Sequence, residues 1–294
     1  MQSASATASA SPFVDRRSPV TAYEAAKMVV MAPVALARIT LVLIILNLGN
    51  AVAWFGMESG RDVDGALRTA FALALAVAGV RMRVRGLEHL AEAEASLADT
   101  KEGCVVVFNH VSILDFVVLL RIRILAFLTH DDWRNLPLGT CFVDYADMVL
   151  IGDPRRVEGG QSVTDELVAR ARDPRRRMVA VAPEGTLSNG SCLLKFRTGA
   201  FAAMAPVLPV VLRYPFRHHN PAWTLEVPPA VKVFRILTQF VTPVELEILP
   251  LVRPADVGAT TPAEFARGVR EAMAAALGVP TVEQSNNDRL GHNY

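Results

Sequence analysis

The pattern of apolar and polar positions divides the chain into a polar beginning, an apolar N-terminal region and a mixed remainder. Residues 1–19 are rich in Ser and Ala and have no apolar periodicity. We therefore predict a disordered tail, which we extend over 1–30. Residues 39–57 then contain no charged side chain, and they approach the ~20 residues that a helix needs to cross a bilayer. This run predicts a transmembrane helix over 31–58.

A second apolar run covers residues 69–80 and is marginal in length for a span. It predicts a second membrane or interfacial helix over 62–84. Basic side chains flank the outer side of both runs: Arg16, Arg17, Lys27, Arg81, Arg83 and Arg85. This favours a hairpin with both outer ends in the cytosol. One crossing, two crossings, a shallow insertion and two buried helices of a soluble domain all remain open.

From residue 86 the pattern changes to short apolar runs that alternate with helical periodicity. The apolar runs predict buried strands over 105–108, 178–182, 207–212 and 244–249. Helices are predicted over 112–121 and 261–277. The alternation indicates an α/β domain over 86–255, a mixed sheet flanked by helices, followed by a C-terminal helix and tail over 256–294.

Composition narrows the classes of protein that fit this pattern. Apolar residues make up 52% of the chain and charged residues 20%, which indicates more burial than a soluble core needs. The 30 basic and 29 acidic side chains give a net charge of +1, which does not indicate a nucleic-acid partner. Cys104, Cys141 and Cys192 show neither metal-ligand spacing nor an even disulfide set. We expect no metal site.

His110 directly follows the predicted strand over 105–108, and Asp115 lies five residues further on. The two side chains can meet if His110 lies outside the following helix and folds back over its first turn. A neutral histidine is a suitable general base near pH 7, and a carboxylate on its other nitrogen fixes its tautomer. Two structural alternatives remain. Ser112 and Asp115 also match a capping box, and His110 could be an ordinary loop histidine.

Two further segments suit recognition of an anion. A strand enters the turn Pro183-Glu184-Gly185-Thr186, whose main-chain donors and hydroxyl could hold an oxyanion or a phosphate. The strand over 207–212 leads to Arg213, whose planar guanidinium suits phosphate. An ordinary turn and a solvated edge-strand charge are the alternatives. There is no Gly-x-Ser-x-Gly elbow and no Gly-x4-Gly-Lys-Ser/Thr loop, which disfavours an α/β serine hydrolase and a phosphate-loop nucleotide hydrolase.

Taken together and in order, these segments resemble the glycerolipid acyltransferase superfamily. Asn109-His110-x4-Asp115 matches its first motif, and Pro183 to Ser188 match its Pro-Glu-Gly-Thr-x-Ser motif. The apolar strand with Pro209 that ends at Arg213 resembles its fourth. Further similarity over 188–201 and 213–223 points to the lysophosphatidylcholine and lysophosphatidylethanolamine acyltransferases.

The resemblance implies a glycerolipid acyltransferase fold and a transfer of acyl groups from acyl-CoA, a substrate and not a cofactor, to a lysophospholipid. It implies that His110 is the general base and that Asp115 orients it. It also implies substrate binding by a set that includes Asn109, Glu184, Gly185, Thr186 and Ser188. The implied location is the endoplasmic reticulum membrane, with the domain facing the cytosol.

The chain departs from the family pattern in its second motif. The segment over 149–153 lacks the arginine expected to hold the substrate phosphate, so Arg155, Arg156 and Arg213 are the candidates for that contact. There is no EF-hand loop, and no calcium site is expected. A lysophosphatidate acyltransferase and an inactive membrane lipid-binding protein remain the alternative functions.

Overall fold

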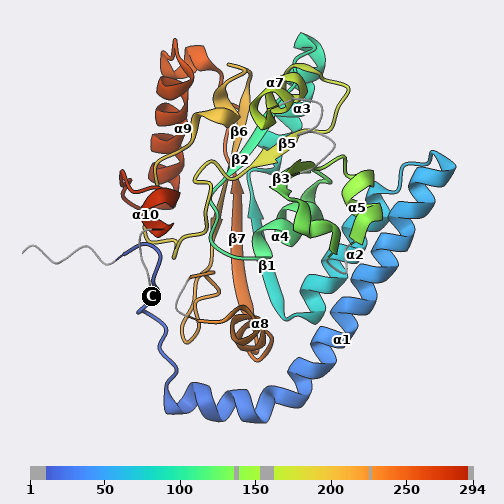
Figure 1. The fold of residues 1–294 in the computed structure, drawn as a ribbon, viewed down its shortest axis with the longest axis vertical. Coiled ribbons are helices and arrows are strands. Elements are labelled where there is room, and N and C mark those ends of the chain that lie inside the picture. Colours follow the sequence, from blue (N-terminus) through green and yellow to red (C-terminus); the bar gives the residue numbers. More distant parts are fainter. Residues whose placement is uncertain (1–10, 136–138, 153–161, 225–226, 291–294) are drawn as a thin grey trace, which may run out of the picture.

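The computed structural model describes residues 11–135, 139–152, 162–224 and 227–290. Its centre is a sheet with the strand order β1-β7-β6-β2-β5-β3-β4 (Figure 1). Neighbouring strands are parallel except for β6 and β7, which are antiparallel. The strands are β1 (Val80–Arg85), β2 (Val105–Phe108), β3 (Ala126–His130), β4 (Val149–Ile151), β5 (Val179–Val181), β6 (Val207–Arg213) and β7 (Thr242–Ile248). The predicted mixed sheet is confirmed.

Helices cover both faces of this sheet. The helices are α1 (Ala22–Ser59), α2 (Asp64–Val77), α3 (Leu87–Thr100), α4 (Leu114–Ile122), α5 (Gly139–Tyr145), α7 (Val163–Arg172), α8 (Pro229–Leu237), α9 (Pro262–Leu277) and α10 (Asn286–Leu290). Short 3-10 helices are η1 (Asp131–Asn135), η2 (Thr198–Phe201) and η3 (Pro254–Val257). Because side chains alternate along a strand, Val106 and Phe108 pack on the face with α2, α3, α4 and α5. Val105 and Val107 pack on the face with α7 and α9.

The four predicted strands and the two predicted helices of the domain are all present, with boundaries shifted by one or two residues. The helix α9 begins and ends as its sequence predicts. The hydroxyl of Thr261 accepts a hydrogen bond from the main-chain N–H of Glu264. Gly278 ends the helix with a φ of 67°, a left-handed conformation that glycine adopts without strain.

The first strand corrects the predicted boundaries. We expected a helix over 62–84 and a domain that starts at residue 86, but α2 ends at Val77 and β1 already begins at Val80. The arginines Arg81, Arg83 and Arg85 alternate with apolar residues, and this period of two fits a strand. Since β1 pairs with β7 along its whole length, it is part of the sheet.

The start of the chain also differs from the prediction. We expected a disordered tail over 1–30, but residues 22–30 belong to α1 and residues 11–18 pack against the domain. Phe13 is only 1% exposed and lies in an apolar cluster with Cys192, Leu194 and Val282. The prediction failed here because a single aromatic anchor gives no periodic signal.

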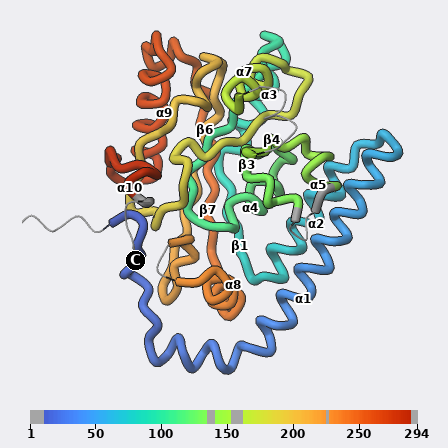
Figure 2. Tube along the Cα trace, viewed as in Figure 1, coloured from blue at the N-terminus to red at the C-terminus, as the bar shows by residue number. Residues whose placement is uncertain are grey.

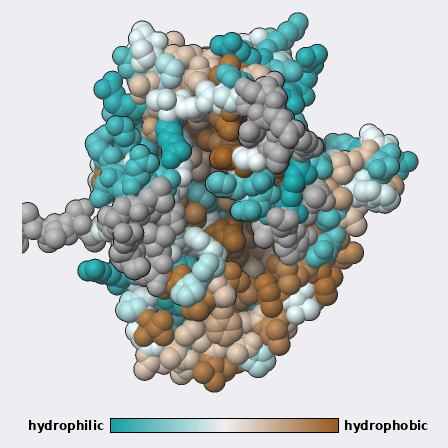
Figure 3. Space-filling model, in the orientation of Figure 1, coloured by the Kyte–Doolittle hydropathy of each residue, from teal (hydrophilic) through white to brown (hydrophobic). Residues whose placement is uncertain are grey.

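The helix α1 is the one helix of the described chain that is long and apolar enough to cross a membrane. It curves around one end of the domain and continues along its side (Figures 1 and 2). It contacts α2, α5 and α8. Its outward-facing side carries large exposed apolar residues: Val29, Val30, Leu36, Leu41, Ile44, Leu48, Trp54 and Phe55. Figure 3 shows apolar surface gathered at this end of the molecule, and more polar surface at the opposite end.

Candidate active site

His110 and Asp115 form a hydrogen-bonded pair at the carboxyl end of β2. The Nδ1 atom of His110 lies 2.9 Å from Oδ2 of Asp115. His110 belongs to the loop between β2 and α4, and Asp115 lies in the first turn of α4, so the loop folds back as the sequence analysis required. The imidazole packs edge-on against Phe116, with ring centroids 5.3 Å apart. Its side chain is 12% exposed, whereas that of Asp115 is fully buried.

The carboxylate of Asp115 receives several hydrogen bonds at once. Its Oδ2 atom also accepts from the main-chain N–H groups of Val111 and Ser112, at 2.8 and 3.0 Å. Its Oδ1 atom accepts from the hydroxyl of Tyr214. The bond from Ser112 N–H is one half of the predicted capping box. The other half is not formed as predicted, because the hydroxyl of Ser112 accepts from the N–H of Leu114 and the N-cap of α4 is Ile113.

Tyr214 is a site residue that the sequence analysis did not identify. It immediately follows β6, and it faces the side of the sheet opposite to that of its neighbour Arg213 because side chains alternate. Burial and the charge of Asp115 raise the pKa of Tyr214 well above its usual value of 10, so its phenol stays protonated and donates. Strand alternation could have predicted its direction, but not its contact with Asp115.

Asn109, which we expected among the substrate-binding residues, instead links two strands. Its Nδ2 donates to the carbonyl of Leu212 at 2.9 Å, and its Oδ1 accepts from the N–H of Leu212 at 2.7 Å. The side chain is buried and continues the β2–β6 ladder beyond the end of β2. Both ends of the amide thus bind main chain, and the predicted substrate contact of Asn109 stays a prediction.

Glu184 follows β5, the neighbour of β2 in the sheet, and it holds the His110 loop. One carboxylate oxygen accepts from the main-chain N–H of His110 and the other from that of Leu194, both at 3.0 Å. Burial raises the pKa of Glu184 to about 7, although these two hydrogen bonds lower it. Both oxygens are engaged inside the fold, so Glu184 holds the loop, and its predicted substrate contact stays a prediction.

Other main-chain groups of the Pro-Glu-Gly-Thr-x-Ser turn also make their hydrogen bonds inside the fold. The N–H of Gly185 donates to the carbonyl of Ala182, and the N–H of Ser188 donates to the carbonyl of His110, both at 3.0 Å. Thr186 and Ser188 are buried. The structure therefore brings this motif together with His110, but as a brace for its loop.

The arginines expected to hold a phosphate do not lie together. Arg155 and Arg156 fall outside the described residues. The guanidinium of Arg213 pairs with Glu247 at 3.0 Å and donates to the carbonyl of Ala276. These contacts place Arg213 on the α9 side of the sheet, so it is not free for the expected role.

Both ends of the described chain hold the loop that follows the turn. The N–H of Asn189 donates to the carbonyl of Pro12 at 2.7 Å. Further along, the N–H of Leu193 donates to the carbonyl of Pro280 at 3.0 Å, and the N–H of Lys195 donates to a carbonyl at residue 284. The loop over 188–195 is thus fixed between the first and last segments of the described chain.

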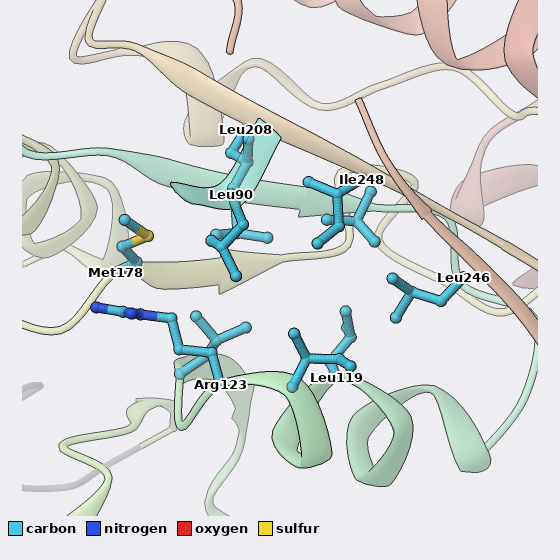
Figure 4. A pocket seen from close by; sticks show the side chains of 11 residues that line it. Leu90, Leu119, Arg123, Met178, Leu208, Leu246 and Ile248 are labelled. Carbon is cyan, nitrogen blue, oxygen red and sulfur yellow. The ribbon is translucent and has the colours of Figure 1, made fainter. Parts of the chain in front are cut away.

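A small apolar cavity lies between the sheet and the helices α3 and α4, lined by residues that include Leu90, Leu119 and Ile248 (Figure 4). Its volume of about 20 Å³ is enough for about one water molecule. This cavity is too small to hold a fatty acyl chain in the described conformation.

The chain is similar to known acyltransferases. The family model described as "Acyltransferase" matches residues 81–213. The chain is 34% identical over 157 residues to lysophosphatidylcholine acyltransferase 1 of Homo sapiens, covering 53% of this chain and 29% of that protein. It is 31% identical over 208 residues to the lysophosphatidylcholine acyltransferase of Drosophila melanogaster, covering 69% and 38%. It is 30% identical over 185 residues to a lysophospholipid acyltransferase of Arabidopsis thaliana, covering 62% and 46%.

A solved structure shows the same fold. The 1-acyl-sn-glycerophosphate acyltransferase PlsC from Thermotoga maritima superimposes with a TM-score of 0.61 at 17% identity, covering 91% of this chain and 99% of that one. The predicted fold is confirmed. Residues 81–213 are thus similar to the acyltransferase family, and lysophospholipid acyltransferases are among the relatives of the chain. It spans less than half the length of these curated relatives.

Proposed function

We propose that this protein transfers a fatty acyl group from acyl-CoA to the free hydroxyl of a lysophospholipid, lysophosphatidylethanolamine or lysophosphatidylcholine. The observation that carries the proposal is the His110–Asp115 pair at 2.9 Å in a loop braced by Glu184. Nδ1 of His110 is engaged by Asp115, and in the described part of the chain no residue binds its Nε2. The histidine thus offers a free basic nitrogen beside a buried carboxylate, which is the arrangement of a general base.

The chemistry follows from this geometry. Nε2 of His110 takes the proton of the acceptor hydroxyl while the oxygen attacks the thioester carbonyl. The tetrahedral intermediate collapses with cleavage of the C–S bond, and the CoA thiolate takes the proton from His110. Asp115 holds the ring orientation and stabilises its cationic form during the transfer. The products are the diacyl phospholipid and free CoA, and no acyl-enzyme is formed.

Membrane attachment by α1 fits this reaction, because both substrates carry acyl chains that partition into a bilayer. The helix contacts the domain along its length through Lys27, Arg38 and Asn50. At about 1.5 Å per residue its 38 residues span roughly 57 Å, which exceeds the ~30 Å hydrocarbon core. In our proposal α1 lies along the membrane surface with its exposed apolar side in the lipid. From the family resemblance we propose the cytosolic face of the endoplasmic reticulum.

A panel of lysophospholipids tests the proposed acceptor. Purified protein in lipid vesicles is given one acyl-CoA and, in turn, acceptors with ethanolamine, choline or unsubstituted phosphate headgroups. We expect CoA release coupled to diacyl product with the first two. Turnover with lysophosphatidate alone indicates a lysophosphatidate acyltransferase. Absence of CoA release with every acceptor indicates a lipid-binding protein without activity.

Replacing the base tests the proposed mechanism. The variant His110→Ala should lose acyl transfer by about 10²- to 10⁴-fold, the usual contribution of a general base, and keep its membrane binding. A matched control is His89→Ala, because His89 lies on α3 and pairs with Glu92 outside the site. Near-normal turnover by the first variant would contradict the assignment.

A further inference from the structure

Arg197 lies across the turn that braces the His110 loop. Its main-chain N–H donates to the carbonyl of Pro183 at 2.8 Å, which anchors it beside the turn. Its side chain then crosses Gly185, where an added Cβ would lie 2.6 Å from Nε and 3.0 Å from Cζ of Arg197. Gly185 has a φ of +66°, a conformation that favours glycine, and the lack of a side chain there leaves room for Arg197. The bare main chain of Gly185 thus provides the surface on which the guanidinium rests.

Within the described chain, the guanidinium of Arg197 has no acidic partner, unlike the basic side chains of Lys195 and Arg213. Arg197 is exposed, and no described residue forms an ion pair or a hydrogen bond with its guanidinium. Lys195, two residues earlier, pairs with Glu283 at 3.5 Å, and Arg213 pairs with Glu247. An arginine placed by a glycine contact and left without an anion has its donors available to a ligand.

The position of Arg197 connects it to the base. Gly185 is bonded to Glu184, whose carboxylate binds the main-chain nitrogen of His110. Arg213, the arginine predicted to contact a phosphate, binds Glu247 and the carbonyl of Ala276. The Glu-Gly-Thr turn, also predicted to bind phosphate, makes its hydrogen bonds inside the fold, so the cation at this turn comes from Arg197.

We propose that Arg197 binds a phosphate group of a substrate and positions it for reaction at His110. This inference rests on the proposed function. Both substrates carry phosphate, since the acceptor has its headgroup phosphodiester and the donor has the phosphates of CoA. Guanidinium suits either, because its planar fork donates two parallel hydrogen bonds to phosphate oxygens.

The test compares Arg197→Gln with Arg197→Lys and with the matched control Lys195→Gln. Each variant is purified at full length, its thermal unfolding is recorded, and KM and kcat are measured for lysophosphatidylethanolamine and for acyl-CoA. A monoacylglycerol serves as an acceptor with the same hydroxyl and no phosphate. Loss of a charge-assisted hydrogen bond corresponds to a factor of about 10 to 100.

We expect Arg197→Gln to raise the KM of one phosphate-bearing substrate about 10- to 100-fold, with kcat and thermal unfolding close to those of the wild type. A rise for the lysophospholipid but not for monoacylglycerol places the headgroup phosphate at Arg197. A rise for acyl-CoA places the CoA phosphates there. Arg197→Lys should be intermediate, and Lys195→Gln should match the wild type. Unchanged KM values, or equal changes in Lys195→Gln, would overturn the proposal.

A binding measurement separates this inference from the proposed function. Equilibrium dialysis of radiolabelled lysophosphatidylethanolamine and of CoA reports affinity without turnover. If the wild-type protein shows no acyl transfer, the proposed function fails. The inference about Arg197 still stands if Arg197→Gln weakens binding of either ligand at least 10-fold, and it fails if binding is unchanged.

Discussion

Asp115 is surrounded by hydrogen-bond donors from two segments, the loop before α4 and the end of β6. His110, Val111 and Ser112 approach one carboxylate oxygen, and Tyr214 approaches the other. A buried carboxylate needs such donors, because its charge is otherwise costly away from water. These contacts also fix its direction, so the orientation of His110 depends on residues from β6 as well as from its own loop.

Removing the Tyr214 hydroxyl should therefore slow the reaction. In Tyr214→Phe, Asp115 loses a charge-assisted hydrogen bond and holds His110 less firmly, which predicts a fall in kcat of about 10-fold or more. Steady-state kinetics of the variant and the wild type measure this change.

The matched control for this prediction is Tyr145→Phe. Tyr145 also donates to a carboxylate, that of Asp64, but at a position between α2 and α5. Its removal should leave kcat unchanged. An equal kcat for the Tyr214 variant and the wild type would show that the phenol does not act on the catalytic pair.

Glu184 predicts a pH dependence of stability. Its pKa is about 7 in the folded protein against 4.5 as its ordinary value, so the folded state binds more protons between these values. The free energy of unfolding should fall as pH rises from about 4.5 to 7, by at most about 3 kcal/mol. In Glu184→Gln this decline should be absent, whereas in Glu271→Gln, an exposed position on α9, it should remain. Parallel pH curves for all three proteins would contradict the prediction.

At the scale of residues, the strand followed directly by a histidine and a helix start showed that His110 and Asp115 could meet, and only the order of the other motifs favoured the pair over a helix cap and a loop histidine. The sequence was not sufficient for the partners of that pair. Tyr214 and Glu184 reach the loop from β6 and from the end of β5, and strand order is not written in any local pattern. The same limit applies to Arg197, which only the contact with Gly185 connects to the turn.

At the scale of elements, α1 is fixed to the domain at both ends. The ammonium group of Lys27 donates to the side-chain oxygen of Gln239, and the guanidinium of Arg38 donates to the carbonyl of Gln239. The side-chain oxygen of Asn50 accepts from the N–H of Phe142. A helix that crosses a bilayer would have its two ends on opposite sides of the membrane. Contact of both parts with a single domain favours an orientation along the surface.

Thiol labelling distinguishes these orientations. Cysteines introduced at Val20 and Glu58, both exposed and close to the two ends of α1, are tested in a Cys141→Ser background because Cys104 and Cys192 are buried. In sealed vesicles with the domain outside, a membrane-impermeant maleimide should label both positions to a similar extent. Labelling of Val20→Cys with full protection of Glu58→Cys would instead show a single crossing.

The elements of the fold were predictable where their period was long or their burial complete. The strand β2 and the helix α9 match their predictions closely because continuous β-branched residues and a capping box leave few alternatives. The strand β1 was assigned to a helix because its apolar residues continue the run of α2 across Gly79. The strand β4 has only three residues, too few for a periodic signal.

At the scale of the whole molecule, segments from opposite ends of the chain meet beside the active site. Phe13 from the start and Val282 from near the end share one apolar cluster with Cys192 and Leu194. The same loop is hydrogen-bonded to both segments, and Figure 1 shows α10 close to the N-terminal segment. The precision of the site therefore depends on residues far from it in sequence.

Truncating the aromatic anchor should show this dependence. Phe13→Ala empties a fully buried site and should lower stability by about 3 kcal/mol, with a several-fold lower kcat because Asn189 and Ser188 lose their support. Thermal unfolding and steady-state turnover measure both effects. The control Leu87→Ala removes an exposed side chain of α3 and should change neither. Full activity with unchanged unfolding in Phe13→Ala would show that the segment rests on the domain without supporting it.

The hydrogen bonds between the loop and residues 280–284 also set an order of events during synthesis. The helix α1 leaves the ribosome before the domain, so it can reach the lipid while the domain is still being made. Strands β2, β5 and β6 follow, but the loop over 193–195 lacks its partners at Pro280 and Gln284 until those residues have emerged. A nascent chain would therefore lie beside its lipid substrates with an incompletely held active-site loop, and it would gain full activity only after residues 280–284 have been added.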